Sequence, residues 1–446
     1  MNYRLALIWG LALTAVIGML LFTIHRDIRF DEEYTIDLRS RIVGARLIKD
    51  GQDPYFYKWK TGDGIRYYDR LNFDSLTVSD ITASPLLLHL LSPIADLPEA
   101  EISRFWLVLE YLMLLAITAV CWQTAGTGTQ KLTVLVFSLL FLLTNAWKQH
   151  IQSGQSYLVI PLLTALFYAC LRQRTKWWWG ALAGLLAISL LLIRANTLFF
   201  FLPFLLLWRR YPRGWWLAFA IAPILLSGWS LLDGHERRLW QDYSVMLDQQ
   251  IRWHQGLPYA TQYNTPDPGF TRWEGIDMAR AHQLRAADPD NVSEDDANVF
   301  WVLRKIAHVN PSVTLVEIVS LGLIGALFVG FCIRGRPFGH LSLERVALLG
   351  YSLYMLSDLT SPVVMRHQYP GVQWLFPVLL AAATLQRRQG LILTGLFAGV
   401  LLNIFHFPLV KMHNTTGEYL LLILILLLSL APGKTATSKP LPAGVS

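Results

Sequence analysis

Long runs of apolar residues alternate with short polar segments along most of the chain. The first run covers Leu5 to Ile24, and the others lie near 103–123, 132–147, 156–171, 177–193, 196–208, 215–232, 312–333, 346–357, 369–385, 390–407 and 418–432. A helix of about 20 apolar residues is long enough to cross a bilayer. The pattern therefore predicts an all-α polytopic membrane protein, a bundle of about twelve transmembrane helices.

The composition agrees with a chain that lies mostly in a bilayer. Of its 446 residues, 54% are hydrophobic and 15% are charged, whereas a soluble domain has about 25% charged residues. The net charge of +7 comes from short clusters between apolar runs, so we expect no nucleic-acid partner. Cys121, Cys170 and Cys332 lie far apart inside apolar runs, which indicates neither a disulfide framework nor a zinc site.

The basic clusters predict the orientation of the chain. With the N-terminus in the cytoplasm, every short basic loop lies inside, as the positive-inside rule requires. Two long segments, 25–102 and 234–311, then face outward, and we expect amphipathic helices in both. We interpret residues 1–432 as a single transmembrane domain in the plasma membrane and residues 433–446 as a disordered cytoplasmic tail.

Polar side chains gather at the predicted outer ends of the spans. The candidates are Asp37, Gln155, Arg194, Asp358, Arg366 and His367. Charge at membrane depth is costly and often functional, although a single residue at a helix end is commonly explained by snorkelling. Glu110 and Glu317 lie one to two turns inside their spans, and the sequence leaves open whether they are structural or functional.

This set of residues suits one kind of chemistry. A carboxylate can remove a proton from an attacking hydroxyl, and an arginine can hold phosphate oxygens with its forked donors. The combination favours transfer of a group from a membrane-bound phosphate ester, with a lipid-linked sugar phosphate as the natural donor. No nucleotide-binding glycine pattern is visible, and none is needed for such a donor.

Four blocks of residues follow one another along the chain. Asp37-Leu38 is followed after twelve residues by Gly51-Gln52-Asp53-Pro54-Tyr55, and a Pro-rich segment covers 84–98. Gly154-Gln155 precedes a helix with Gly180 and Gly184 that ends at Ile193-Arg194, and four residues separate Ser361-Pro362 from His367. In this order the blocks resemble glycosyltransferase family 87 of the membrane-embedded C-type glycosyltransferases. Related sequences usually have Lys at position 194, Val-Tyr where this chain has Ser40-Arg41, and an aromatic residue before the His, where this chain has Met365-Arg366.

The resemblance implies a C-type bundle with a catalytic first outer loop. Asp37 would be the general base, Arg194 and His367 would hold the donor phosphate, with Asp358 and Arg366 beside them, and Gln155 would line the sugar site. The donor would be a polyprenyl-phosphate-linked sugar, with mannose as the default, and the acceptor a hydroxyl of a lipid or glycan at the outer leaflet. Transfer would invert the anomeric centre, and neither a metal nor another cofactor is expected.

Three other functions are compatible with parts of the pattern. A transporter or flippase also suits twelve spans, but it often shows an internal repeat, and none is visible here. A polymer ligase with a lipid-diphosphate donor would favour more arginines at the outer face. A purely structural subunit would leave the gathering of polar residues unexplained.

Overall fold

The structure is a computed structural model that describes residues 3–30, 36–57, 59, 61–68, 81–173, 175–255, 296–334, 341–363, 367, 369–386, 389–407, 410 and 412–431. Within these residues the regular elements are α-helices and 3-10 helices, and no strand occurs. The predicted all-helical fold is therefore confirmed. The predicted tail, 433–446, and Arg366 lie outside the described residues.

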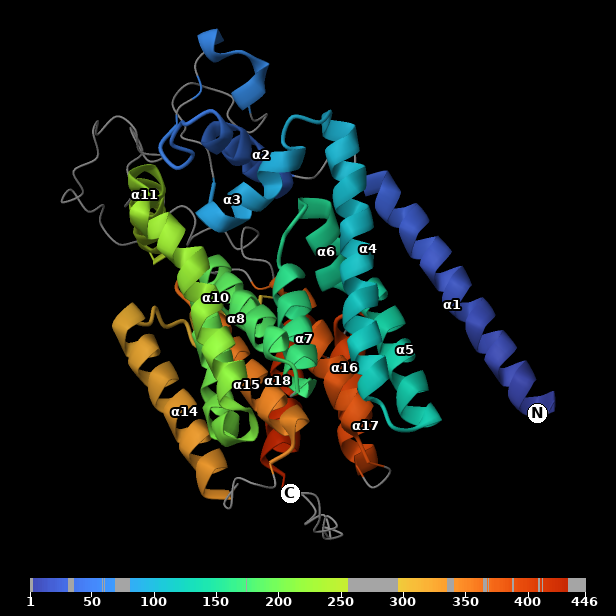
Figure 1. The fold of residues 1–446 in the computed structure, drawn as a ribbon. Coiled ribbons are helices and arrows are strands. Elements are labelled where there is room, and N and C mark those ends of the chain that lie inside the picture. Colours follow the sequence, from blue (N-terminus) through green and yellow to red (C-terminus); the bar gives the residue numbers. More distant parts are fainter. Residues whose placement is uncertain are drawn as a thin grey trace.

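Helices of mostly apolar sequence form a bundle (Figure 1), with α1 and α14 at its opposite edges. They are α1 (Tyr3–Phe30), α4 (Glu99–Thr124), α5 (Gly128–Leu143), α6 (Asn145–Ser153), α7 (Val159–Arg172), α8 (Trp177–Ile193), η4 (Ala195–Thr197), α9 (Leu198–Phe201), η5 (Leu202–Arg210), α10 (Arg213–Leu232), α14 (Val313–Arg334), α15 (Leu343–Leu359), η9 (Pro370–Trp374), α16 (Leu375–Thr384), α17 (Gly390–Leu402) and α18 (His413–Leu430).

The remaining helices come from the two long polar segments. They are α2 (Ile36–Lys49), η1 (Thr61–Asp63), η2 (Ile65–Tyr67), α3 (Pro85–Leu91), η3 (Ser92–Ile94), α11 (Gly234–Gln255) and α13 (Val299–Ile306). Figure 1 shows α2, α3 and α11 together at one end of the bundle. The expectation that both long segments contain helices is confirmed.

Only some of the apolar helices are long enough to cross a bilayer by themselves. Within the described chain, α4, α14 and α18 are, and α5 with α6 makes a fourth span if the pair, bent by 57°, is counted as one. Others are shorter, including α7, α8 and α17. Pro203 begins a 3-10 stretch in η5, and Pro223 lies inside α10, so proline accounts for part of the irregularity. A polytopic membrane fold is supported, and the number of about twelve spans stays a prediction.

Helix α15 lies in the centre of the bundle. Every residue from Val346 to Leu359 is buried. A Cβ added at Gly350 would collide with the backbone carbonyl of Phe200 in α9, so the missing side chain permits the close approach of α9 and α15. This contact brings the start of α9, and the residues just before it, beside the C-terminal half of α15.

A second close approach joins α8 to α10. Gly180 and Gly184 of α8 face the backbone carbonyls of Trp215 and Phe219, and a Cβ at either glycine would overlap them. Small residues four apart commonly allow such packing between membrane helices. The two glycines noticed in the sequence thus fix the helix that ends at Arg194.

The helices at the end of the bundle share a small core of their own. Residues such as Leu38 of α2, Leu88 of α3 and Leu239 of α11 are buried against one another. Between α2 and α3, Gly51 has a φ of 71°, which favours glycine, and Tyr55 donates hydrogen bonds from its backbone N–H to Asp53 (2.8 Å) and from its hydroxyl to the carbonyl of Ala83 (2.9 Å).

Candidate functional site

Arg194 lies at the break between two helices and forms an ion pair with Asp358. It is the C-cap of α8, with an extended backbone, and its N–H donates to the carbonyl of Leu190 at 2.8 Å. Its guanidinium contacts the carboxylate of Asp358, near the end of α15. The side chain of Asp358 is wholly buried, whereas that of Arg194 is 14% exposed. A small part of the Arg194 side chain therefore remains accessible.

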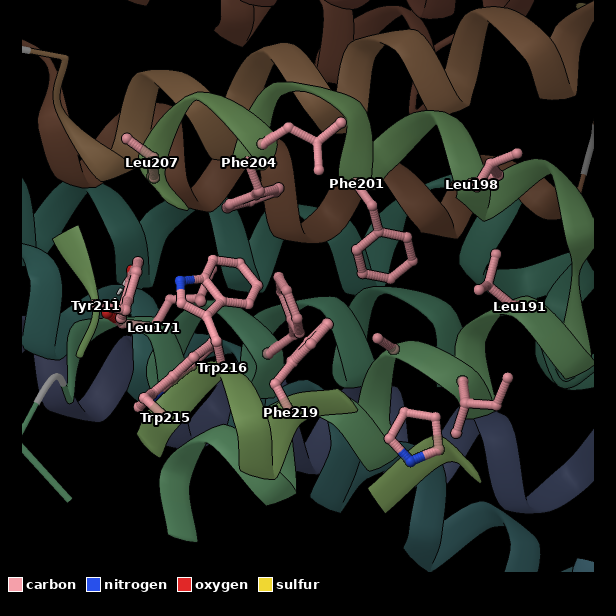
Figure 2. A pocket seen from close by; sticks show the side chains of 15 residues that line it. Leu171, Leu191, Leu198, Phe201, Phe204, Leu207, Tyr211, Trp215, Trp216 and Phe219 are labelled. Atoms are coloured by element: carbon pink, nitrogen blue, oxygen red, sulfur yellow. Dashed lines mark hydrogen bonds between the residues drawn. The ribbon is translucent and has the colours of Figure 1, made fainter. Parts of the chain in front are cut away.

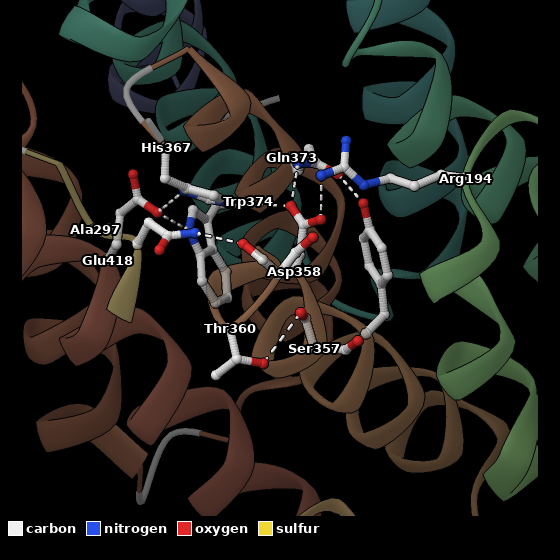
Figure 3. A network of polar contacts seen from close by, with 12 residues as sticks. Arg194, Ala297, Ser357, Asp358, Thr360, His367, Gln373, Trp374 and Glu418 are labelled. Atoms are coloured by element: carbon white, nitrogen blue, oxygen red, sulfur yellow. Dashed lines mark hydrogen bonds and ion pairs between the residues drawn. The ribbon is translucent and has the colours of Figure 1, made fainter. Parts of the chain in front are cut away.

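His367 is held between two carboxylates (Figure 3). Its Nε2 lies 3.3 Å from Oδ2 of Asp358, and its Nδ1 lies 2.6 Å from Oε2 of Glu418 in α18. The indole N–H of Trp374 donates to the same Glu418 oxygen at 3.0 Å. The result is a buried row of ionisable side chains from Arg194 through Asp358 and His367 to Glu418.

Neighbouring polar groups hold this row in place. The side chain of Gln373 donates to Asp358 at 3.1 Å and accepts the hydroxyl of Tyr354. Asp296 accepts the backbone N–H of His367 at 2.7 Å. Burial raises the pKa of Asp296 to about 7, although the hydrogen bonds from the backbone of Asn298 and His367 act in the opposite direction. The connection before α13 thereby anchors His367.

Asp37 belongs to a second polar cluster. It lies in the first turn of α2, where the helix dipole favours a carboxylate, and it accepts a hydrogen bond from the side-chain amide of Gln155. Arg41, one turn further along α2, donates to the side-chain oxygen of Gln155 at 2.6 Å and to the carbonyl of Gly154 at 2.9 Å. Asp37 is half-buried, and Gln155 and Arg41 are buried.

The sequence of α6 explains why Gln155 points into this cluster. Gly154 ends α6 in the left-handed region, with φ of 63°, and the N–H of Gln155 then donates to the carbonyl of His150 at 3.0 Å. This is the usual glycine C-cap, which reverses the chain after a helix. The indole of Trp106 donates to the carbonyl of Gln155 at 3.3 Å. These hydrogen bonds fix the backbone at Gln155 and so the direction in which its side chain extends.

Tyr157 connects the two clusters. It follows Gln155 by two residues, a separation of at most about 7 Å along the backbone, and the guanidinium of Arg194 lies 5.2 Å from the centre of its ring. The ring of Tyr369 also packs against Tyr157, with ring centres 5.6 Å apart. Residues 155–157 therefore join the two clusters, because Gln155 contacts Asp37 and Tyr157 contacts Arg194.

An apolar groove lies along the helices that precede and follow Arg194, α8 and α9. Its volume is about 240 Å³, and its lining residues come from α7, α8, α9, η5 and α10. Figure 2 shows Leu191 and Leu198, which flank Arg194 in the sequence, at one end of the groove, and Tyr211 with Trp216 toward the other. The lining is almost entirely hydrocarbon and aromatic. A long apolar chain is the kind of ligand that such a groove accepts.

The structure brings most of the predicted residues together. Gln155 contacts Asp37 directly, and Arg194, Asp358 and His367 form one connected network. Glu110 is not part of either cluster, because it is buried against His150 at 3.1 Å. Glu317 is exposed on α14.

Several residues of the network were missed at the sequence level. Glu418 begins the last apolar run, so the same argument about charge at membrane depth applies to it. Arg41 follows Asp37 by four residues, which places both on one face of a helix. Gln373 and Tyr157 carry no such signal, because uncharged polar residues are common near helix ends.

The fold and site combine a bundle of apolar helices with two clusters of buried polar side chains and an apolar groove. The chain belongs to glycosyltransferase family 87, whose model matches residues 82–362, well over half of the chain. The match includes Gln155, Arg194 and Asp358, whereas Asp37, His367 and Glu418 lie outside it. The comparison with curated proteins found no match. The protein is therefore a membrane glycosyltransferase, acting on a sugar donor and an acceptor.

Proposed function

We propose that the protein transfers a sugar from a polyprenyl phosphate to an acceptor hydroxyl, with inversion at the anomeric carbon. The observation that carries this proposal is the position of Arg194, between an apolar groove and a segment that leads to Asp37. A lipid phosphate needs an apolar channel with a cation at its mouth. A transferase also needs a base within reach of the carbon that is attacked.

Arg194 would hold the phosphate of the donor. Its contact with Asp358 occupies part of the guanidinium and fixes its orientation, and the remaining N–H donors would bind phosphate oxygens. Arginine suits this task because its donors form a planar fork. His367 is wholly buried, so it would act on the phosphate through Asp358 and Arg194 rather than by direct contact.

Asp37 would be the general base. Its half-buried position leaves part of the carboxylate accessible to an acceptor, and the hydrogen bond from Gln155 limits its rotation. An inverting displacement requires the hydroxyl to approach from the side opposite the departing phosphate. Asp37 contacts Gln155 at one end of the 155–157 segment, and Arg194 contacts Tyr157 at the other. These positions are consistent with a base and a phosphate anchor on opposite sides of the anomeric carbon.

The groove beside Arg194 would accept the isoprenoid chain of the donor. Its aromatic walls, from Phe201 to Trp216, match a branched hydrocarbon better than a polar ligand. The guanidinium of Arg194 lies against the ring of Tyr157, and Tyr243 is close enough to Arg194 to interact with it electrostatically. Their rings and hydroxyls would pack against the sugar, and mannose is our default. The site would then face the outer leaflet of the plasma membrane.

Transfer by the purified enzyme tests this function. The protein would be reconstituted in vesicles and incubated with radiolabelled polyprenyl-phosphate mannose, glucose or arabinose and a membrane lipid extract as acceptor. We expect one of these donors to be consumed with release of polyprenyl phosphate and inversion in the product. Transfer from a nucleotide sugar or a lipid diphosphate sugar, with none from the three lipid monophosphates, would overturn the proposal.

A further inference from the structure

Glu418 is the member of the buried row furthest from the accessible part of Arg194. It lies on α18, outside the region that matches the family, and its side chain is 3% exposed. Its surroundings are built for a carboxylate. Trp374 donates to it, and Gly371 leaves the space that it fills, because a Cβ there would lie 2.8 Å from its Oε1. Gly417, directly before it, packs on the carbonyl of Gly399 in α17.

The position of His367 between two carboxylates determines where its protons can lie. A neutral imidazole donates from one nitrogen only, whereas an imidazolium donates from both. Here Nδ1 faces Glu418 and Nε2 faces Asp358. The row is electrically balanced when His367 is an imidazolium, with two cations alternating with two carboxylates. A buried charge is tolerated when it is paired in this way.

The proposed reaction changes the charge beside Arg194. The donor is a phosphodiester with one negative charge, and the departing polyprenyl phosphate is a monoester that carries up to two. Asp358 contacts the same guanidinium that would hold this phosphate. As long as Asp358 is ionised, it competes with the phosphate for the positive charge of Arg194. Neutralising Asp358 during transfer would remove that competition.

We propose that Glu418 and His367 together form a proton store that neutralises Asp358 as the phosphate departs. The Nε2–H bond of His367 breaks, and an O–H bond forms on Asp358. Nδ1–H remains donated to Glu418, and no other reactant is needed. Arg194 then faces the phosphate alone. Glu418 is a positioning residue that acts through His367, and the inference rests on the proposed function of the site.

Binding of two phosphates of different charge tests the proposal. Glu418→Gln keeps the shape of the side chain but removes the charge that supports an imidazolium. We expect it to weaken binding of polyprenyl phosphate about tenfold, or about 1.4 kcal/mol. Binding of polyprenyl methyl phosphate, a phosphodiester with one negative charge, should change by less than threefold. Glu418→Asp should recover part of the loss. Glu110→Gln is the matched control, because Glu110 also forms a buried pair with a histidine, His150.

A purely structural role for Glu418 would weaken binding of the two phosphates equally and give the same pattern as Glu110→Gln. That result would overturn the inference. If Glu418→Gln does not fold, ¹⁵N spectra of the histidines in the wild-type protein provide the second test, with His367 assigned from His367→Gln. Polyprenyl phosphate should convert His367 from imidazolium to neutral imidazole, and an unchanged spectrum would contradict the proton shift. Failure of the proposed function is distinct, because wild-type protein would then bind neither phosphate.

Discussion

Replacing Arg194 by alanine removes the cation from a pair whose carboxylate has no access to solvent. Loss of one partner from a buried ion pair costs about 3–5 kcal/mol. The lower end applies here, because Arg194 is 14% exposed and because Gln373 and His367 still face Asp358. Loss of charge-assisted hydrogen bonds to a phosphate costs about 1.5–3 kcal/mol, so donor binding should weaken roughly 10- to 100-fold.

The two effects can be separated with a second substitution. Arg194→Ala with Asp358→Asn removes both charges and should recover most of the thermal stability, yet it should bind donor as weakly as the single variant. Arg194→Lys should recover part of the binding. Thermal unfolding in detergent and titration with polyprenyl phosphate measure the two quantities. Donor affinity equal to wild type in the double variant would refute the role of Arg194 as phosphate anchor, and a fully stable Arg194→Ala would refute the importance of the ion pair.

Three other predictions test the groove, the outer helices and the topology. Leu191→Trp should narrow the groove and raise the KM for a long polyprenyl donor by about fivefold. The KM for a donor with two isoprene units should change little. An equal change for both donors would argue against the groove as the lipid site. Burial raises the pKa of Asp53 from 3.8 to about 6, although hydrogen bonds from the backbone act in the opposite direction. The protonated Asp53 therefore contributes to stability below pH ~4, and this contribution is lost as the pH rises through 6. Asp53→Asn should remove that loss, about 3 kcal/mol. A melting temperature with the same dependence on pH as wild type would contradict this. Asp63→Cys should react with an impermeant thiol reagent in intact cells, and Thr129→Cys at the other end of the bundle should react only after lysis, whereas the reverse pattern would invert the proposed orientation.

The sequence predicted the elements better than their lengths. Hydrophobic runs identify helices because burial in lipid requires apolar surface along a whole segment. They do not show where a helix bends, and the bend between α5 and α6 and the 3-10 stretch of η5 shorten several of the expected spans. Both depend on packing against neighbouring helices.

The candidate site could be predicted in its charged parts. Asp37, Arg194, Asp358 and His367 stood out because charge near a membrane interior is costly. Their division into two clusters could not be predicted, since it depends on the turn after Gly154 and on close helix contacts such as that at Gly350. The burial of His367 could not be predicted either, because its partners Asp358 and Glu418 come together only in the folded chain.

The central claim is that Asp37 removes the proton from the acceptor, and single-turnover transfer by Asp37→Asn tests it most directly. The substitution keeps the size of the side chain but cannot accept the proton, so transfer should fall by roughly 10²–10⁴-fold while affinity for the lipid donor stays near wild type. Asp53→Asn, in the same outer segment, is the control and should transfer normally. Normal transfer by Asp37→Asn, with loss of transfer in Asp358→Asn despite intact donor binding, would contradict the assignment and move the base to the buried row.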